Sequence, residues 1–212
     1  MSVLVDIHSH LLPTIDDSHL KEDEMFAFYE RYHKLGFSLL CFTPHLYNPY
    51  VTTQIGEIGA VFSKAQKMAS EIGLKTALGA EVFIREYPTY KVLPILNKYV
   101  LCETDVSLPP HQLEEKLDKI AALGFKVILA HIERYRWLNM KSSFFNHAQE
   151  KGYLFQVNAE KDLTSKAKDY LDSGIVDFLG SDNHGDIDRI ETLFDVYNQY
   201  PYVADKMEKF LL

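Results

Sequence analysis

Short runs of apolar residues alternate with stretches of helical periodicity along the whole chain. The apolar runs predict strands over residues 3–7, 38–43, 75–82, 99–103, 125–130, 153–157 and 175–179. Between the first two of these runs, and again between the fourth and fifth, apolar positions recur with the spacing of a helix. Each of these two segments ends at a glycine, Gly36 or Gly124, of the kind that ends helices. The pattern therefore predicts a strand followed by a helix, repeated.

The composition of the strands indicates how they are arranged. Segments such as SLLCFT and KVILA are apolar almost throughout, which is typical of a parallel sheet covered on both faces. About seven strand–helix units favour a closed (β/α)7 barrel over an open sheet, although periodicity leaves closure undecided. The sequence shows no Pro- or Ser-rich linker, low-complexity tract or internal repeat, so we expect a single α/β domain over residues 1–212.

Overall composition narrows the class of protein. Apolar residues make up 47% and charged residues 25% of the 212 residues, which are globular values that exclude disorder and coiled coil. Acidic residues outnumber basic ones by 30 to 22, and the net charge of −8 disfavours nucleic acid and anionic membrane as partners. No apolar run approaches the length of a membrane span, and Cys41 and Cys102 lie inside apolar runs. We therefore expect a cytoplasmic protein with reduced, buried thiols and no membrane insertion.

Histidine and acidic residues recur at the carboxyl ends of the expected strands. In a parallel α/β barrel these ends emerge on one face, so residues that are distant in sequence converge there. The candidate metal ligands collected in this way are His8, His10, Asp17, His45, Glu81, Glu103, His131, Asp182 and His184. Imidazole and carboxylate groups suit Zn, Mn and Fe, and no thiolate is among them.

The number of candidates indicates more than one ion. Nine ligands exceed the about four to six that one ion accepts, so we expect two or three bridged divalent ions. Taken singly, each histidine has the alternative of a structural hydrogen bond, and Glu81 or Glu103 could cap a helix. Taken together, burying so many ionisable groups without cations would cost several kcal/mol each, which favours the metal cluster. Among the residues nearby, Asp16 is a candidate to hydrogen-bond a ligand histidine, whereas His19 is expected to be solvated or to cap a helix.

Two arginines stand beside the candidate ligands. Arg134 follows His131 by three residues, and Arg189 comes shortly after the last candidates. A guanidinium offers planar donors that match phosphate oxygens, so we expect both to bind a phosphate ester. The alternative is a surface ion pair with Glu133 or Asp188. The sequence contains no phosphate-binding GxxxxGK[ST] loop and no nucleophile-elbow motif.

The motifs DIHSHLLPTIDDS, TPH, GAEV, LAHIERY and SDNH closely resemble those of the polymerase and histidinol phosphatase (PHP) superfamily. Within it, they resemble the capsular-polysaccharide (CpsB/CapC-type) tyrosine-protein phosphatases. The resemblance implies a distorted (β/α)7 barrel and two or three ions, usually manganese, with iron, zinc, cobalt or magnesium as alternatives. It implies three ion positions, held by His8, His10, Glu81 and Asp182, by Glu81, Glu103 and His131, and by Asp17, His45 and His184. The segment Gln156-Val157-Asn158 is similar to the family's sixth-strand motif.

The expected function is therefore a metal-dependent phosphomonoesterase in which a metal-bridging hydroxide attacks phosphorus and Arg134 and Arg189 grip the phosphoryl group. His45 or a metal-bound water would serve as general acid. The resemblance implies that the substrate is phosphotyrosine on the tail of the tyrosine kinase that controls polysaccharide chain length, and it leaves the oligomeric state open. The alternatives are histidinol phosphatase or another small-molecule phosphatase, a phosphodiesterase, and a non-catalytic metal-binding regulatory module. Residues 47–54 and 105–110 are expected to form an apolar rim that suits a phenyl ring.

Overall fold

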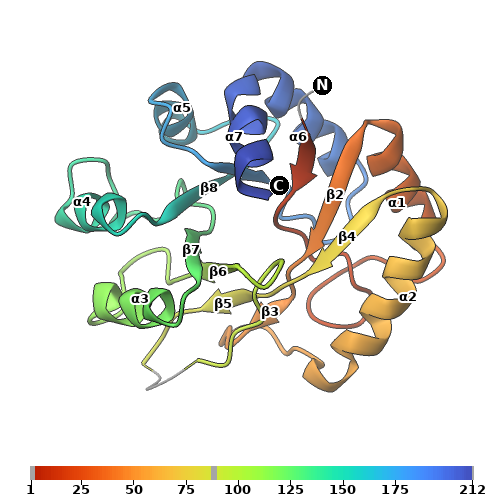
Figure 1. Ribbon diagram of the computed structural model, residues 1–212, viewed down its shortest axis with the longest axis horizontal. Helices are drawn as coiled ribbons and strands as arrows, with labels where there is room; N and C mark the ends of the chain where they lie inside the picture. Colours follow the sequence, from red (N-terminus) through yellow and green to blue (C-terminus); the bar gives the residue numbers. More distant parts are fainter. Residues whose placement is uncertain (1–2, 87–89, 212) are drawn as a thin grey trace.

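A computed structural model describes residues 3–86 and 90–211 of the chain (Figure 1). Every pair of adjacent strands is parallel, and the strands fall into two hydrogen-bonded sheets in the orders β1-β2-β4 and β3-β5-β6-β7-β8-β9. The strands within the described residues are β1 (Leu4–Asp6), β2 (Phe37–Phe42), β3 (His45–Leu46), β4 (Lys75–Leu78), β5 (Glu81–Phe83), β6 (Tyr99–Glu103), β7 (Lys126–Leu129), β8 (Leu154–Asn158) and β9 (Phe178–Gly180). The α/β class and the parallel arrangement expected from the sequence are confirmed.

The predicted strand over residues 75–82 is wrong in one respect, because it breaks at Gly79 into β4 and β5. The backbone N–H of Gly79 donates to the carbonyl of Phe42 at 2.9 Å. A Cβ at this glycine would lie 2.3 Å from Cγ1 of Ile95, so the chain passes where only glycine fits. The preceding strand path breaks at the same level, between β2 and β3, where Pro44 offers no N–H to a ladder. Counting β2 with β3 and β4 with β5, seven strand paths follow one another in sequence order in the part described.

The last strand returns to the first and closes the curled sheet at its carboxyl end. The N–H of Asp182 donates to the carbonyl of His8, and the N–H of His10 to the carbonyl of Asn183, each at 2.8 Å. Just below this seam, the buried carboxylate of Asp6 accepts hydrogen bonds from the N–H and the hydroxyl of Ser181, at 2.9 and 2.5 Å. The seam therefore brings the segment after β1 against the segment after β9.

The predicted strand over residues 175–179 lies later than expected, at β9. The register explains the shift, because Phe178 pairs with Gln156 and Gly180 pairs with Asn158 on β8. Residues 175–177 precede this ladder, although Asp177 still binds Phe155 through its backbone N–H at 2.9 Å. Periodicity could not reveal this position, since it depends on a partner strand that is distant in sequence.

Helices cover the outside of the curled sheet (Figure 1). They are α1 (Met25–Lys34), α2 (Ile58–Glu71), α3 (Leu113–Ala122), α4 (Ser143–Glu150), α5 (Ser165–Asp172), α6 (Asp188–Gln199) and α7 (Pro201–Leu211), with a short 3-10 helix, η1 (Ile55–Glu57). Gly36 and Gly124 follow α1 and α3 with φ of 85° and 93°, which confirms the predicted helix ends. None of the helices in residues 3–86 and 90–211 has the length and apolar character needed to cross a bilayer.

The interior is one continuous cluster of apolar side chains between the sheet and the helices. The aromatic residues Phe28, Tyr29 and Tyr32 of α1 are buried in it. Cys41 and Cys102 are free thiols in the same core, and burial raises the pKa of both well above the usual range. The thiols are therefore packing residues, inaccessible and protonated.

Candidate metal centre

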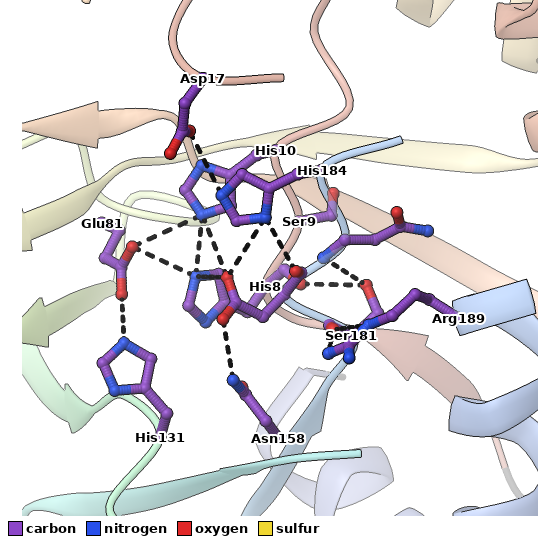
Figure 2. Close-up of polar contacts among 12 residues, drawn as sticks. His8, Ser9, His10, Asp17, Glu81, His131, Asn158, Ser181, His184 and Arg189 are labelled. Atoms are coloured by element: carbon purple, nitrogen blue, oxygen red, sulfur yellow. Dashed lines mark hydrogen bonds and ion pairs between the residues drawn. The ribbon is translucent and has the colours of Figure 1, made fainter. Parts of the chain in front are cut away.

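The candidate ligands from the sequence lie together around the seam between β1 and β9, and Figure 2 shows part of this cluster. Most lie at or just after the carboxyl end of a strand, whereas His45 and Glu81 are the first residues of β3 and β5. Seven of them are buried, namely His8, His10, His45, Glu81, Glu103, His131 and Asp182. Asp17 and His184 stand at the open side, with 43% and 28% of their side chains exposed. The topology thus collects imidazoles and carboxylates from every strand path except that of β8 into one largely buried cluster.

The innermost group has donor separations of the size that a metal site requires. Nε2 of His8 and Nε2 of His10 face each other at 3.1 Å. Oε2 of Glu81 lies 3.3 and 3.5 Å from these two nitrogens, and Oδ1 of Asp182 lies 3.4 and 3.5 Å from them. Donors that each bind one ion at about 2.0–2.2 Å lie roughly 3–4 Å apart, so these five separations fit a divalent cation. His8, His10 and Asp182 lie close enough together to hold one ion, with Glu81 beside them.

Glu81 connects this group to a second one. Its Oε1 lies 2.8 Å from Nε2 of His131, and its Oε2 lies 3.0 Å from Nδ1 of His45. Glu103 approaches the same two histidines, with Oε1 3.2 Å from Nδ1 of His45 and Oε2 3.8 Å from Nε2 of His131. A carboxylate placed between two groups of imidazoles is the arrangement that a bridging ligand requires.

The third group lies at the open side of the cluster. Oδ1 of Asp17 lies 3.2 Å from Nε2 of His184 and 3.7 Å from Nε2 of His45. His45 therefore faces two groups, through Nδ1 toward Glu81 and Glu103 and through Nε2 toward Asp17. The resemblance had placed His45 in the third group alone, whereas the structure places its ring between the second and the third.

Within the cluster, protonated histidines balance the negative charge of the carboxylates. Burial alone lowers the pKa of His45, but hydrogen bonds to Glu103 and Glu81 outweigh it and raise the pKa to about 10. Burial likewise opposes ionisation of Glu81 and Asp182, yet the neighbouring histidines, His8 foremost, hold the pKa of each carboxyl well below its usual range. The carboxylates are thus anionic and require a cationic partner, which is either protonated imidazole or a metal ion.

Two further features indicate a site that the surrounding fold holds under constraint. Nδ1 of His131 and Oδ1 of Asp16 are buried and have no hydrogen-bond partner among the described residues. His131 and Asp182 also adopt left-handed backbone conformations, with φ of 32° and 49°. Such conformations cost about 1–3 kcal/mol each and persist where the surroundings over-determine them, typically at functional sites.

Asp16 has the place that the sequence suggested. Its Oδ2 accepts a hydrogen bond from Nδ1–H of His10 at 2.8 Å and from the backbone N–H of His45 at 3.1 Å. The first contact fixes the proton of His10 on Nδ1 and turns Nε2 toward the cluster. The expectation of a hydrogen bond between Asp16 and a candidate ligand histidine is confirmed.

Both arginines reach the cluster, but with different partners from those considered. Nη1 of Arg134 lies 2.9 Å from Oδ2 of Asp182, and 46% of its side chain is exposed. Arg189 donates through Nε to the carbonyl of Ser181 at 3.0 Å and through Nη1 to Glu160 at 2.8 Å. Neither arginine forms an ion pair with Glu133 or Asp188, but Arg189 pairs with Glu160, so the alternative of an ion pair with a neighbouring carboxylate holds for Arg189 with a different partner.

A cavity of about 520 Å³ opens over the cluster and is lined by both arginines. Asn48, Tyr50 and Val51 line it, which confirms that residues 47–54 form part of the rim. Residues 105–110 do not line this cavity. They contribute instead to a neighbouring pocket of about 270 Å³, which shares Tyr50 with the first.

Sequence patterns missed two residues of the cavity wall. Asn48 donates through Nδ2 to Oε1 of Glu103 at 2.8 Å, and the only signal was its position in the expected rim loop. His19 lines the cavity although we expected a solvated or capping residue. Its backbone N–H binds the carbonyl of His184, a contact across the seam that no local pattern reveals.

Comparison with known proteins gives consistent matches over most of the chain. The tyrosine-protein phosphatase CpsB of Streptococcus pneumoniae is 26% identical over 201 residues, covering 85% of this chain and 83% of that protein. The structure resembles that of metal-dependent tyrosine phosphatases, YwqE from Bacillus subtilis and CpsB from S. pneumoniae, with a TM-score of 0.74 at 21% identity, covering 92% of this chain and 87% of the other.

A histidinol phosphate phosphatase from Lactococcus lactis, solved with zinc, L-histidinol and phosphate, shares the fold with a TM-score of 0.53 at 15% identity, covering 94% and 93% of the two chains. The family model described as capsular polysaccharide synthesis, CpsB/CapC, matches residues 4–209, nearly the whole chain. The chain therefore belongs to the CpsB/CapC family of capsular polysaccharide synthesis.

Proposed function

We propose that this protein is a metal-dependent phosphomonoesterase that hydrolyses phosphotyrosine on a protein substrate. The observation that carries the proposal is the innermost group of donors, in which two imidazole nitrogens lie 3.1 Å apart and two carboxylates each place an oxygen 3.3–3.5 Å from both nitrogens, with no charged lysine among them. The family, the phosphatase names of its relatives and the arginines beside the cluster support phosphate esters as substrates.

The proposed ion positions follow the three groups of donors. His8, His10, Glu81 and Asp182 would hold one ion, Glu81, Glu103, His131 and His45 a second, and Asp17, His184 and His45 a third where a third is bound. We propose manganese, with iron, zinc, cobalt or magnesium able to use the same nitrogen and oxygen donors. Bound ions would supply Lewis acidity toward phosphoryl oxygens and bring the pKa of water toward neutrality.

The chain's own residues orient the substrate around this centre. Arg134 has one guanidinium edge on Asp182 and an exposed remainder that faces the cavity, so it can donate to equatorial phosphoryl oxygens. Arg189 can do so only by leaving Glu160. The phenol of tyrosine has a pKa near 10 and departs with little protonation. His45 could assist only through the nitrogen that no ion occupies, because a coordinated nitrogen carries no proton.

The proposed substrate follows from the rim and from the family. Tyr50 is 82% exposed at the boundary between the cavity and the neighbouring pocket, where Leu108 and Pro110 add apolar surface. Such surface suits a phenyl ring and the chain on either side of it. We propose a cytoplasmic setting and the phosphotyrosine tail of a capsule-synthesis tyrosine kinase as the partner. Histidinol phosphate and a purely regulatory metal-binding role are the alternatives that the experiments below distinguish.

Removal of metal is expected to abolish hydrolysis of a generic aryl phosphate, and Mn²⁺ is expected to restore it. Chelation should also lower the melting temperature, because the buried carboxylates lose their cations. The measurements are phosphate release and thermal unfolding before and after chelation. The Cys41→Ser/Cys102→Ser double variant serves as a control that should keep its turnover and resist iodoacetamide, since both thiols are buried. Undiminished activity in excess chelator would rule out the metal mechanism.

Substitution of Arg134 separates the phosphate contact from the metal site. Arg134→Ala should lower kcat/KM roughly 10- to 1000-fold, because it removes a charge-assisted donor to the phosphoryl group. Bound metal should be unchanged, since Asn158 still holds Oδ2 of Asp182 at 2.8 Å. Arg189→Ala should cost less, because Glu160 and Ser181 already engage that guanidinium. Steady-state kinetics with parallel metal analysis gives the answer, and unaltered kinetics for Arg134→Ala would assign this arginine a structural role only.

A comparison of substrates tests the specificity. Phosphotyrosine peptides should be hydrolysed with kcat/KM well above that for phosphoserine peptides or histidinol phosphate, because Tyr50, Leu108 and Pro110 place apolar and aromatic surface beside the cavity. The three substrates are compared side by side at saturating Mn²⁺. A clear preference for histidinol phosphate would overturn the proposed substrate and leave the metal centre in place, and an absence of hydrolysis of all three would favour the regulatory role.

A further inference from the structure

Two uncharged amide side chains on β8, Gln156 and Asn158, lie beneath the candidate metal centre. Both are completely buried, and they point to the same face because alternate residues of a strand do so. Neither belongs to the groups of donors described above. A buried primary amide is costly unless its oxygen and nitrogen are hydrogen-bonded, so the partners of these two groups decide what they can do.

The partners fix the orientation of the Gln156 amide. The backbone N–H of His131 can only donate, and it lies 2.8 Å from Oε1 of Gln156, which must therefore be the oxygen. Nδ1 of His8 lies 3.2 Å from the same oxygen. Because two acceptors cannot bond to each other, this nitrogen of His8 carries the proton. Nε2 of a neutral His8 is then left with its lone pair directed at His10, Glu81 and Asp182.

The orientation of the Gln156 amide in turn fixes the orientations of Asn158 and Asp182. Nε2 of Gln156 donates to Oδ1 of Asn158 at 2.8 Å. This contact turns Nδ2 of Asn158 toward Oδ2 of Asp182, also at 2.8 Å, and Figure 2 shows this second contact. Arg134 occupies this same oxygen. Oδ1 of Asp182 is thereby the oxygen left to face His8 and His10. One backbone donor thus sets the direction of a chain of hydrogen bonds that ends on two candidate ligands.

Packing keeps the first amide in place. A Cβ at Gly180 would lie 2.9 Å from Nε2 of Gln156 and 2.7 Å from Cβ of His8, so β9 presses its bare backbone against both side chains. The amide therefore has little freedom to rotate. Groups that fix the tautomer and orientation of a ligand commonly contribute about 10–100-fold in metal affinity.

We infer that Gln156 and Asn158 are positioning residues that hold His8 in its Nδ1–H tautomer and aim Oδ1 of Asp182, so that the innermost donors are set for a cation before it binds. This inference rests on the proposed metal-dependent function. It assigns no direct contact with substrate to either residue. It predicts an effect on metal affinity and on the state of the His8 ring, with turnover preserved once metal is saturating.

The test compares variants of β8 in the full-length protein. Gln156→Leu should weaken Mn²⁺ binding about 10–100-fold, measured by calorimetric titration of the metal-free protein. Gln156→Glu keeps an acceptor for His131 and His8 but loses the donor to Asn158, so it should recover only part of that loss. Val157→Ala is the matched control, because Val157 is equally buried on the same strand but points to the other face, and it should lower stability without changing Mn²⁺ affinity. At saturating Mn²⁺ the kcat of Gln156→Leu should approach that of the unmodified protein.

The tautomer of the His8 imidazole is measured separately, in the metal-free protein. Two-bond ¹H–¹⁵N spectra of the metal-free, unsubstituted protein should show the Nδ1–H tautomer for neutral His8, and Gln156→Glu should retain it. If Gln156→Leu does not fold, Gln156→Glu and Asn158→Leu carry the test, the latter with weakened Mn²⁺ binding and an unchanged His8 tautomer. An Nε2–H tautomer in the unsubstituted protein, or equal Mn²⁺ affinities for Gln156→Leu and Val157→Ala, would overturn the inference. Loss of phosphatase activity with an intact Nδ1–H tautomer would instead count against the proposed function alone.

Discussion

The removal of four imidazoles and three carboxylates from bulk water at one end of a curled sheet is the constraint on which the rest of the site depends. An isolated buried charge costs several kcal/mol, so such a cluster persists only if opposite charges stand between its members. Protonated histidines supply these charges in the absence of metal, which is why the pKa of His45 rises to about 10 while that of Glu81 falls. Divalent cations would neutralise the same carboxylates with fewer cationic groups, because each ion carries two charges, and they would do so through directional bonds.

The fold creates this constraint through its closure. Parallel strands bring their carboxyl ends to one face, and the contacts between His8, His10 and the segment after β9 join the first path to the last at that face. The residues that close the seam are therefore adjacent to the residues that would hold ions. Asp6 stabilises the closure from below through Ser181, so the shape of the site and the integrity of the sheet depend on the same few hydrogen bonds. Local strain at Asp182, with its left-handed backbone, is a consequence of this double role.

Much of this arrangement could be predicted from the sequence, because it follows from periodicity and from position. The alternation of apolar runs with helical periodicity predicted parallel strands and helices. The histidine and acidic residues at the ends of the expected strands predicted that these side chains would lie together, before any contact between them was known. What could not be predicted depends on partners that are distant in sequence. The break at Gly79 depends on Ile95, and the place of β9 depends on its register with β8. The partners of the arginines and the role of Asn48 likewise follow only from the folded chain.

The central claim, that the buried cluster is a centre for divalent ions, is tested most directly by counting those ions. The purified protein, saturated with Mn²⁺ and freed of excess metal, is analysed for its elemental content, and anomalous X-ray scattering from its crystals locates each ion. The account predicts two to three ions per chain, one of them among His8, His10, Glu81 and Asp182. Less than one ion per chain under metal-replete conditions, or ions bound only outside this cluster, would contradict it.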